Sequence, residues 1–195
     1  TTQQVMDAMS PDAQGLLAVV ATEEATGSEA LAAALEGARL VAVLTQAQDP
    51  GNAGTIIRAA DAAGADAVVL VRGSVDPTAP KVVRSTAGSL FHLPVVTGVA
   101  LDDAVTALHN AGLTVLAADG RGDFDLFEAE SLLEAPSAWL LGNEAHGLPS
   151  EALSRADAVV SIPIYGKAES LNVAAAAAVC LYASARAQAQ NSGRS

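Results

Sequence analysis

From residue 39 onward, short apolar runs alternate with segments whose apolar residues recur at helical spacing. The run RLVAVLT (39–45) is apolar without interruption, which is typical of a parallel strand buried on both faces. Pro94 indicates an edge position or an irregularity for one of the strands. The alternation predicts an α/β fold with a mostly parallel sheet flanked by helices. We expect further strands at 67–72, 91–98, 113–119, 137–143 and 158–164, and helices at 52–63, 80–88, 101–112, 150–156 and 170–190.

A first polar segment, DPGNAGTIIR (49–58), follows the first predicted strand. Its Pro-Gly pair predicts a tight turn, and Asn52 is the expected cap of the helix that follows. Arg58 and Asp61 fall on the polar face of this helix, so a plain surface ion pair between them is one interpretation. A nucleotide-binding loop is disfavoured, because the chain contains neither GxGxxG nor GxxxxGK[ST].

A second polar segment lies within WLLGNEAHGLPSEAL (139–153). The strand at its start brings Gly142 and Glu144 to the carboxyl edge of the sheet, where α/β proteins bind ligands. Gly142 and Gly147 allow close approach of the backbone or a positive φ. Glu144 and His146 resemble an acid–base pair or two metal ligands. A metal site fails on ligand count, and Glu144 alone fits a loop hydrogen bond as well as a functional acid.

A third polar segment, SIPIYGKAESLNV (161–173), joins the last predicted strand to the last helix. Ser170 is the expected cap of that helix, and Asn172 is expected in its first turn. Free backbone N–H groups there favour an anion or a carboxylate. The alternative is that Ser170 only caps the helix.

Composition limits the classes of protein. The hydrophobic fraction is 51% and the aromatic fraction only 3%, so we expect one sizeable domain with an aliphatic core. The single cysteine, Cys180, excludes a disulfide within one chain and is expected to pack in the interior. No signal peptide or membrane span is recognisable, so a cytoplasmic protein is expected. The net charge of −12 argues against a strongly basic nucleic-acid footprint.

Taken together and in this order, the three segments resemble the motifs of the SpoU/TrmH-type RNA 2′-O-ribose methyltransferases of the SPOUT superfamily. Motif one corresponds to residues 52–58, motif two to 141–144 with 147–148, and motif three to 162–164 with 170–174. The resemblance covers residues 39–186.

The resemblance implies a SPOUT fold with a C-terminal trefoil knot, and transfer of a methyl group from S-adenosyl-L-methionine to a ribose hydroxyl of RNA. Ribosomal RNA is favoured over transfer RNA. It also implies a homodimer through the knot region, with Arg58 acting across the interface, and no membrane. The implied catalytic residues are Arg58, Asn52, Glu144, Ser170 and Asn172. The implied cofactor-binding residues are Leu116, Ala118, Leu141, Gly142, Asn143, Gly147, Ile162, Ile164, Ser170, Leu171 and Asn172.

Two roles remain open for Arg58. It either removes the proton of the ribose hydroxyl or clamps the RNA phosphate while water takes the proton, and a guanidinium is a poor base. The rival readings are a catalytically inactive RNA-binding member and a nucleotide-binding oxidoreductase, the latter disfavoured by the absent glycine fingerprint.

Residues 1–37 differ from the rest and end in an Ala-rich helix. We interpret them as the remnant or linker of an N-terminal substrate-binding domain like ribosomal protein L30, followed by a catalytic domain at 38–190 and a disordered tail at 191–195. Loss of an RNA-reading domain would account for the acidic charge. The candidates for basic residues at the mouth of the site are Arg58, Arg72, Lys81, Arg84, Arg121 and Lys167.

Overall fold

The computed structural model describes residues 2–9, 25–143 and 146–192 of the chain. These residues form a seven-stranded sheet in the order β3-β2-β1-β6-β4-β7-β5, and every neighbouring pair is parallel. The predicted α/β fold is therefore confirmed. The strands are β1 (Leu40–Leu44), β2 (Ala67–Leu70), β3 (Val95–Val96), β4 (Thr114–Ala118), β5 (Phe124–Asp125), β6 (Ser137–Leu141) and β7 (Ala158–Ser161). The helices are α1 (Gln3–Met9), α2 (Gly27–Ala34), α3 (Pro50–Ala62), α4 (Pro80–Thr86), α5 (Leu101–Asn110), α6 (Glu130–Glu134), α7 (Ser150–Arg155) and α8 (Val173–Ser192), with a 3₁₀ turn, η1 (Ser89–Phe91).

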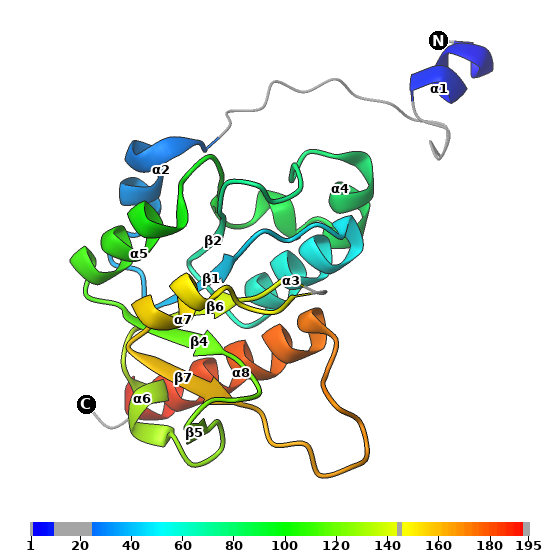
Figure 1. The fold of residues 1–195 in the computed structure, drawn as a ribbon. Coiled ribbons are helices and arrows are strands. Elements are labelled where there is room, and N and C mark those ends of the chain that lie inside the picture. Colours follow the sequence, from blue (N-terminus) through cyan, green and yellow to red (C-terminus); the bar gives the residue numbers. More distant parts are fainter. Residues whose placement is uncertain (1, 10–24, 144–145, 193–195) are drawn as a thin grey trace.

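Helices cover both faces of the sheet (Figure 1). Side chains alternate across each strand, so the sheet supplies two separate apolar clusters. One cluster packs α3, α6 and α8 against one face, through residues such as Ile56, Leu133 and Leu181. The other packs α2, α5 and α7 against the opposite face, through residues such as Leu31 and Val105. The described residues from α2 onward therefore form a three-layer αβα sandwich.

The long helix α8 is joined to the central strand β6 by buried polar contacts. The indole Nε1 of the fully buried Trp139 donates a hydrogen bond to Ser184 Oγ at 2.9 Å. Gln188 Nε2 donates to the carbonyl oxygens of Arg39 and Ala135 at 3.1 and 3.0 Å. Because an unpaired polar group in the interior is costly, these bonds hold α8 in one register on the sheet.

The order of the strands places the ligand edge of the sheet. The chain adds β6 between the earlier strands β1 and β4, and then adds β7 between β4 and β5. All strands are parallel, so the carboxyl ends of β1, β4, β6 and β7 share one edge. The trefoil knot stays a prediction.

Several local features differ from expectation. The side chain of Asp49, not of Asn52, caps α3, because Pro50 occupies the first helical position and Asp49 Oδ1 accepts from the Asn52 N–H at 2.8 Å. The partner of Asp61 is His92, whose Nδ1 lies 2.8 Å from the carboxylate, and not Arg58 as considered from the sequence. The short elements β5 and α6 were not expected from the sequence.

The segment around α2 packs on the sheet, because Leu31 and Leu35 are buried against one of its faces. The proposed division into domains stays a prediction, and residues 10–24 and 193–195 lie outside the described residues. As predicted, β3, which follows Pro94, lies at an edge of the sheet. No helix among the described residues is long and apolar enough to cross a membrane.

Candidate functional site

A pocket of about 470 Å³ opens at the carboxyl ends of β4, β6 and β7 and beside the start of α8. This volume lies within the range of small-molecule and cofactor sites in proteins. Most of the residues that the sequence analysis assigns to cofactor binding line it. The lining residues are Ala118, Asp119, Gly120, Gly142, Asn143, Gly147, Val160, Ile162, Ile164, Glu169, Ser170, Leu171, Asn172, Val173 and Ala176.

Motif two forms a tight backbone crossing at the pocket. Asn143 and Gly147 exchange backbone hydrogen bonds of 3.0 and 2.8 Å, which closes a small loop. A Cβ on Gly142 would lie 2.5 Å from the carbonyl carbon of Gly147 and 2.6 Å from the amide nitrogen of Leu148. Gly147 has a φ of 68°, which favours glycine. Glu144, the predicted acid of this motif, lies outside the described residues.

Asn143 also connects the pocket to the loop after β1. Its side-chain amide donates a 2.8 Å hydrogen bond to the carbonyl oxygen of Gln46, a residue with a φ of 56°. A positive φ is uncommon for a residue other than glycine and is maintained here by its surroundings. The loop that leads into motif one is therefore tied to motif two.

Motif three begins α8, and Asn172 has two contacts there. Its Oδ1 accepts from the backbone N–H of Ala174 at 2.8 Å, so Asn172 caps the helix and Ser170 does not. Its Nδ2 donates to Asn52 Oδ1 at 3.2 Å. One side chain thus joins motif three to motif one. Ser170 lines the pocket as an exposed residue before the helix.

The remaining predicted residues divide into two groups. Ile162, Ile164 and Leu171 supply apolar surface to the pocket. Leu116 and Leu141 do not line it, because their side chains are buried in the cluster beneath α3 and α8.

Arg58 lies on the exposed side of α3, outside the pocket lining. Asn52 lies six positions earlier on α3 and contacts Asn172 at the pocket. The helix that bears Arg58 is therefore attached to the pocket at its N-terminal end. Of the six basic residues considered for the mouth of the site, all of which the structure describes, none lines the pocket.

Asp119, at the end of β4, is a residue of the pocket to which the sequence analysis assigned no role. Arg121 donates to both of its carboxylate oxygens, from Nε at 2.9 Å and from Nη2 at 3.0 Å. These hydrogen bonds hold the pKa of Asp119 below its ordinary value, so the carboxylate is ionised near neutral pH. A carboxylate at the carboxyl end of a parallel strand was the available signal in the sequence.

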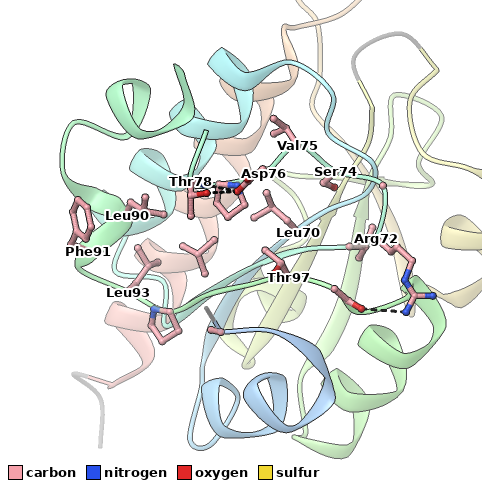
Figure 2. A pocket seen from close by; sticks show the side chains of 17 residues that line it. Leu70, Arg72, Ser74, Val75, Asp76, Thr78, Leu90, Phe91, Leu93 and Thr97 are labelled. Atoms are coloured by element: carbon pink, nitrogen blue, oxygen red, sulfur yellow. Dashed lines mark hydrogen bonds between the residues drawn. The ribbon is translucent and has the colours of Figure 1, made fainter. Parts of the chain in front are cut away.

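A second hollow, of about 610 Å³, lies at the other end of the sheet beside β2 and β3 (Figure 2). Its polar groups are bonded to the protein itself: Asp76 to Thr78 at 2.7 Å, and Arg72 to the carbonyl oxygen of Gly98 at 3.3 Å. Arg72 and the exposed Phe91 stand at opposite ends of it. None of the predicted catalytic or cofactor-binding residues lines this hollow, so the pocket at β4, β6 and β7 is the candidate site.

The chemistry of the candidate pocket fits a nucleoside-like ligand with polar and apolar parts. Apolar side chains from β7 and the start of α8 form its walls, and amide, hydroxyl and carboxylate groups stand among them. Glycine at position 142 lets the backbone of Gly147 and Leu148 approach closer than any side chain would allow. Among the described residues, no group of three His, Cys, Asp or Glu side chains is placed to hold a metal ion.

Comparison with known proteins points to a single family. The profile of the SpoU rRNA methylase family matches residues 39–182. The chain is 42% identical over 151 residues to the 23S rRNA (guanosine(2553)-2′-O)-methyltransferase RlmP of Bacillus subtilis (strain 168), a match that covers 76% of the chain and 58% of that protein. It is 41% identical over 142 residues to the 23S rRNA (uridine(2479)-2′-O)-methyltransferase of Streptomyces viridochromogenes, covering 70% of the chain and 49% of that protein. The chain thus spans about half the length of these relatives.

A solved structure agrees with this result. The AdoMet-bound rRNA methyltransferase from Sinorhizobium meliloti superimposes with a TM-score of 0.80 at 31% sequence identity, covering 95% of this chain and 70% of that one. The family profile covers all three motifs and the strands and helices that bring them together at the pocket. The chain belongs to the SpoU rRNA methylase family.

Proposed function

We propose that the chain is an S-adenosylmethionine-dependent methyltransferase that modifies a ribose 2′-hydroxyl of ribosomal RNA. The observation that carries this proposal is the meeting of three separate motifs at one site. Motifs two and three line one pocket, and the Asn172–Asn52 hydrogen bond attaches motif one to its rim. The activities in the names of the two Bacillus and Streptomyces relatives support ribosomal RNA as the substrate.

The bound cofactor would supply a methyl group activated by the sulfonium. Residues of the pocket have the task of holding the donor, with apolar walls at Ile162 and Leu171 and polar groups at Asn143 and Ser170. In-line transfer requires that the ribose oxygen, the methyl carbon and the sulfur lie on one line, so positioning contributes much of the rate. Asn172 serves this positioning because it sets α3 relative to the pocket.

We assign Arg58 to the phosphate beside the reacting ribose. A guanidinium remains protonated and presents a planar fork of donors that matches a phosphate. Its exposed position on α3 leaves it accessible to RNA. In this assignment Glu144 and Ser170 orient the ribose, and the proton of the hydroxyl passes to water.

The test is methyl transfer by the wild-type chain and by Arg58→Ala to an excess of 23S ribosomal RNA at low salt, with modified nucleotides mapped by mass spectrometry. Low salt is needed because salt weakens phosphate contacts steeply. We expect a 2′-O-methyl product from the wild type and a loss of rate of about 100-fold in Arg58→Ala, with S-adenosylmethionine affinity unchanged.

Arg155→Ala is the matched control, because Arg155 lies on α7, against the opposite face of the sheet, where it pairs with Asp102. Its rate should equal that of the wild type. Methylation on a base, methylation of transfer RNA alone, or full activity in Arg58→Ala would each contradict the assignment.

We further propose that the chain acts as a homodimer in which Arg58 serves the pocket of the partner subunit. Large apolar side chains are exposed around motif three and α8, with exposed fractions of 88% for Tyr165, 52% for Tyr182 and 40% for Leu171. Large exposed apolar side chains along one stretch of the chain, residues 165–182, support an interaction surface there. A cytoplasmic location follows from a ribosomal RNA substrate.

A further inference from the structure

The carboxylate of Asp119 is largely buried and is held by hydrogen bonds from Arg121. Its side chain is only 11% exposed, yet the residue lines the pocket. Its backbone N–H donates to the carbonyl oxygen of Val160 at 3.1 Å, which attaches it to β7. The following turn is also tightly packed, since a Cβ on Gly122 would lie 2.6 Å from the carbonyl oxygen of Val159. The position of Asp119 is therefore fixed by its own backbone hydrogen bond to β7 and by the close packing of the turn that follows it.

Arg121 leaves a defined part of this carboxylate available. Oδ1 accepts from the backbone N–H and from Nε of Arg121, both at 2.9 Å, and Oδ2 accepts from Nη2 at 3.0 Å. A carboxylate offers about four acceptor positions in all, so one remains, on Oδ2. Arg121 is itself 78% exposed and does not line the pocket. It therefore holds Asp119 from outside and does not occupy the space for a ligand.

The balance of charge selects the kind of group that Asp119 can bind. Its negative charge is already offset by Arg121, so a further cation gains little there. A neutral hydroxyl donor, in contrast, gains a charge-assisted hydrogen bond. Acidic residues near the carboxyl edge of parallel sheets bind ribose hydroxyls in dinucleotide-binding folds by the same chemistry. Glu169, the other carboxylate among the described residues that line the pocket, is exposed and lies in the loop before α8.

We propose that Asp119 binds a ribose hydroxyl of the adenosine part of the methyl donor, and that Arg121 is the residue that positions it. The inference rests on the proposed function, because it takes S-adenosylmethionine as the ligand of the pocket. It assigns the nucleoside end of the donor to the end of β4.

The test is calorimetric titration of the chain with S-adenosylmethionine and with its 2′-deoxyadenosyl and 3′-deoxyadenosyl analogues. We expect one analogue to bind the wild type roughly 10- to 100-fold more weakly, the loss expected for a hydrogen bond to a charged group. Asp119→Ala should weaken S-adenosylmethionine by a similar factor and should no longer distinguish it from that analogue. Glu169→Ala removes the same charge from the pocket and should leave the discrimination intact.

Arg121→Ala tests the positioning role through a pH profile. Arg121 lowers the pKa of Asp119, so its removal raises that pKa and brings protonation to a higher pH. The acid limb of S-adenosylmethionine affinity should therefore move to higher pH in Arg121→Ala, which a purely structural loss would not produce.

The outcomes separate the two proposals. No binding of S-adenosylmethionine to the wild type would overturn the proposed function and this inference with it. Tight binding that is equal for both deoxy analogues, or unchanged in a folded Asp119→Ala, would overturn the role of Asp119 alone. Equal binding of both analogues by the wild type overturns the role of Asp119 without any variant, so the proposal stays falsifiable if Asp119→Ala fails to fold.

Discussion

At the scale of single residues, Gly142 carries the closest backbone approach at the pocket. Any side chain there would meet the backbone of Gly147 and Leu148, which cannot move aside as a flexible side chain would. The requirement is steric and does not depend on the ligand. It explains why a glycine stands between a buried strand and a polar loop.

Gly142→Ala should destabilise the fold by about 1–3 kcal/mol, the usual cost of forcing an extra methyl group into packed space. Urea unfolding of the two proteins measures the difference. Gly120→Ala is the control, because a Cβ at Gly120 meets nothing within 4 Å. Equal stability of Gly142→Ala and the wild type would contradict the close backbone approach between Gly142 and Gly147.

Cys180 gives a second test at this scale. Its side chain is fully buried in α8, and burial raises the pKa of the thiol to about 12. The thiol is therefore protonated throughout the pH range 6–9, and the thiolate is the reactive form. Native protein should resist a disulfide reagent such as DTNB, whereas protein in denaturant should release one equivalent. Rapid labelling of native protein would place Cys180 at the surface.

At the scale of elements, α8 joins the parts of the site. Its N-terminal end presents Asn172 to Asn52 on α3, and its C-terminal half is held to β6 through Trp139 and Ser184. Tyr182 adds a hydrogen bond from its hydroxyl to the carbonyl oxygen of Ala62, at the end of α3. Displacement of α8 would therefore disturb the relation of motif three to motif one.

Ser184→Ala should cost about 1–3 kcal/mol of stability, because the buried indole N–H of Trp139 loses its acceptor. Urea unfolding followed by fluorescence reports on it directly, since Trp139 is the one tryptophan of the chain. Ser131→Ala, on the exposed surface of α6, should leave the transition in place. An unchanged midpoint in Ser184→Ala would show that the bond contributes nothing.

The longer elements of this fold and most of the shorter ones could be predicted from the sequence, whereas β5 and α6 could not. β1 is a continuous apolar run, β6 is apolar after Ser137, and α5 has a clear helical period, so each was identifiable within a residue or two. β5 has two residues and exists through its pairing with β7, which lies 36 positions away along the chain. Sequence periodicity has no access to such a pairing.

The residues that cap α3 and α8 could not be identified from the sequence alone. Asp49 and Asn52, like Ser170 and Asn172, are all residue types that cap helices, so type alone did not decide between them. Pro50 at the first helical position was the usable signal for Asp49. Asp119 was missed because the sequence pattern placed it as the last residue of a strand. Its contact with Arg121 depends on the turn that follows, which the pattern does not predict.

At the scale of the whole molecule, two late strands enter between earlier ones. β6 lies between β1 and β4, and β7 between β4 and β5, so the site is complete only when segments distant in sequence have come together. Motif one is brought to motif three across 120 positions by the Asn172–Asn52 bond. The family resemblance supplied what periodicity could not, namely that these segments meet.

The proposed homodimer predicts complementation between two impaired variants, assayed at an S-adenosylmethionine concentration too low to saturate Ala176→Leu. Arg58→Ala keeps an intact pocket, and Ala176→Leu fills the pocket but keeps Arg58. If Arg58 serves the pocket of the partner, co-refolded mixed dimers contain one complete site and recover part of the methyl transfer. Light scattering on each sample measures the oligomeric state. Mixed dimers without activity would show that Arg58 acts within its own subunit.

The central claim is that the pocket at the ends of β4, β6 and β7 holds the methyl donor, and two neighbouring alanines of α8 test it most directly. Ala176 lines the pocket, whereas Ala175 is exposed on the same helix and does not line it. Calorimetric titration with S-adenosylmethionine should give one binding site of similar affinity in the wild type and in Ala175→Leu. In Ala176→Leu the affinity should fall by a factor of about ten or more, as expected for a clash of about 1.4 kcal/mol or more. Equal affinity in the two leucine variants, or no binding to the wild type, would contradict the account.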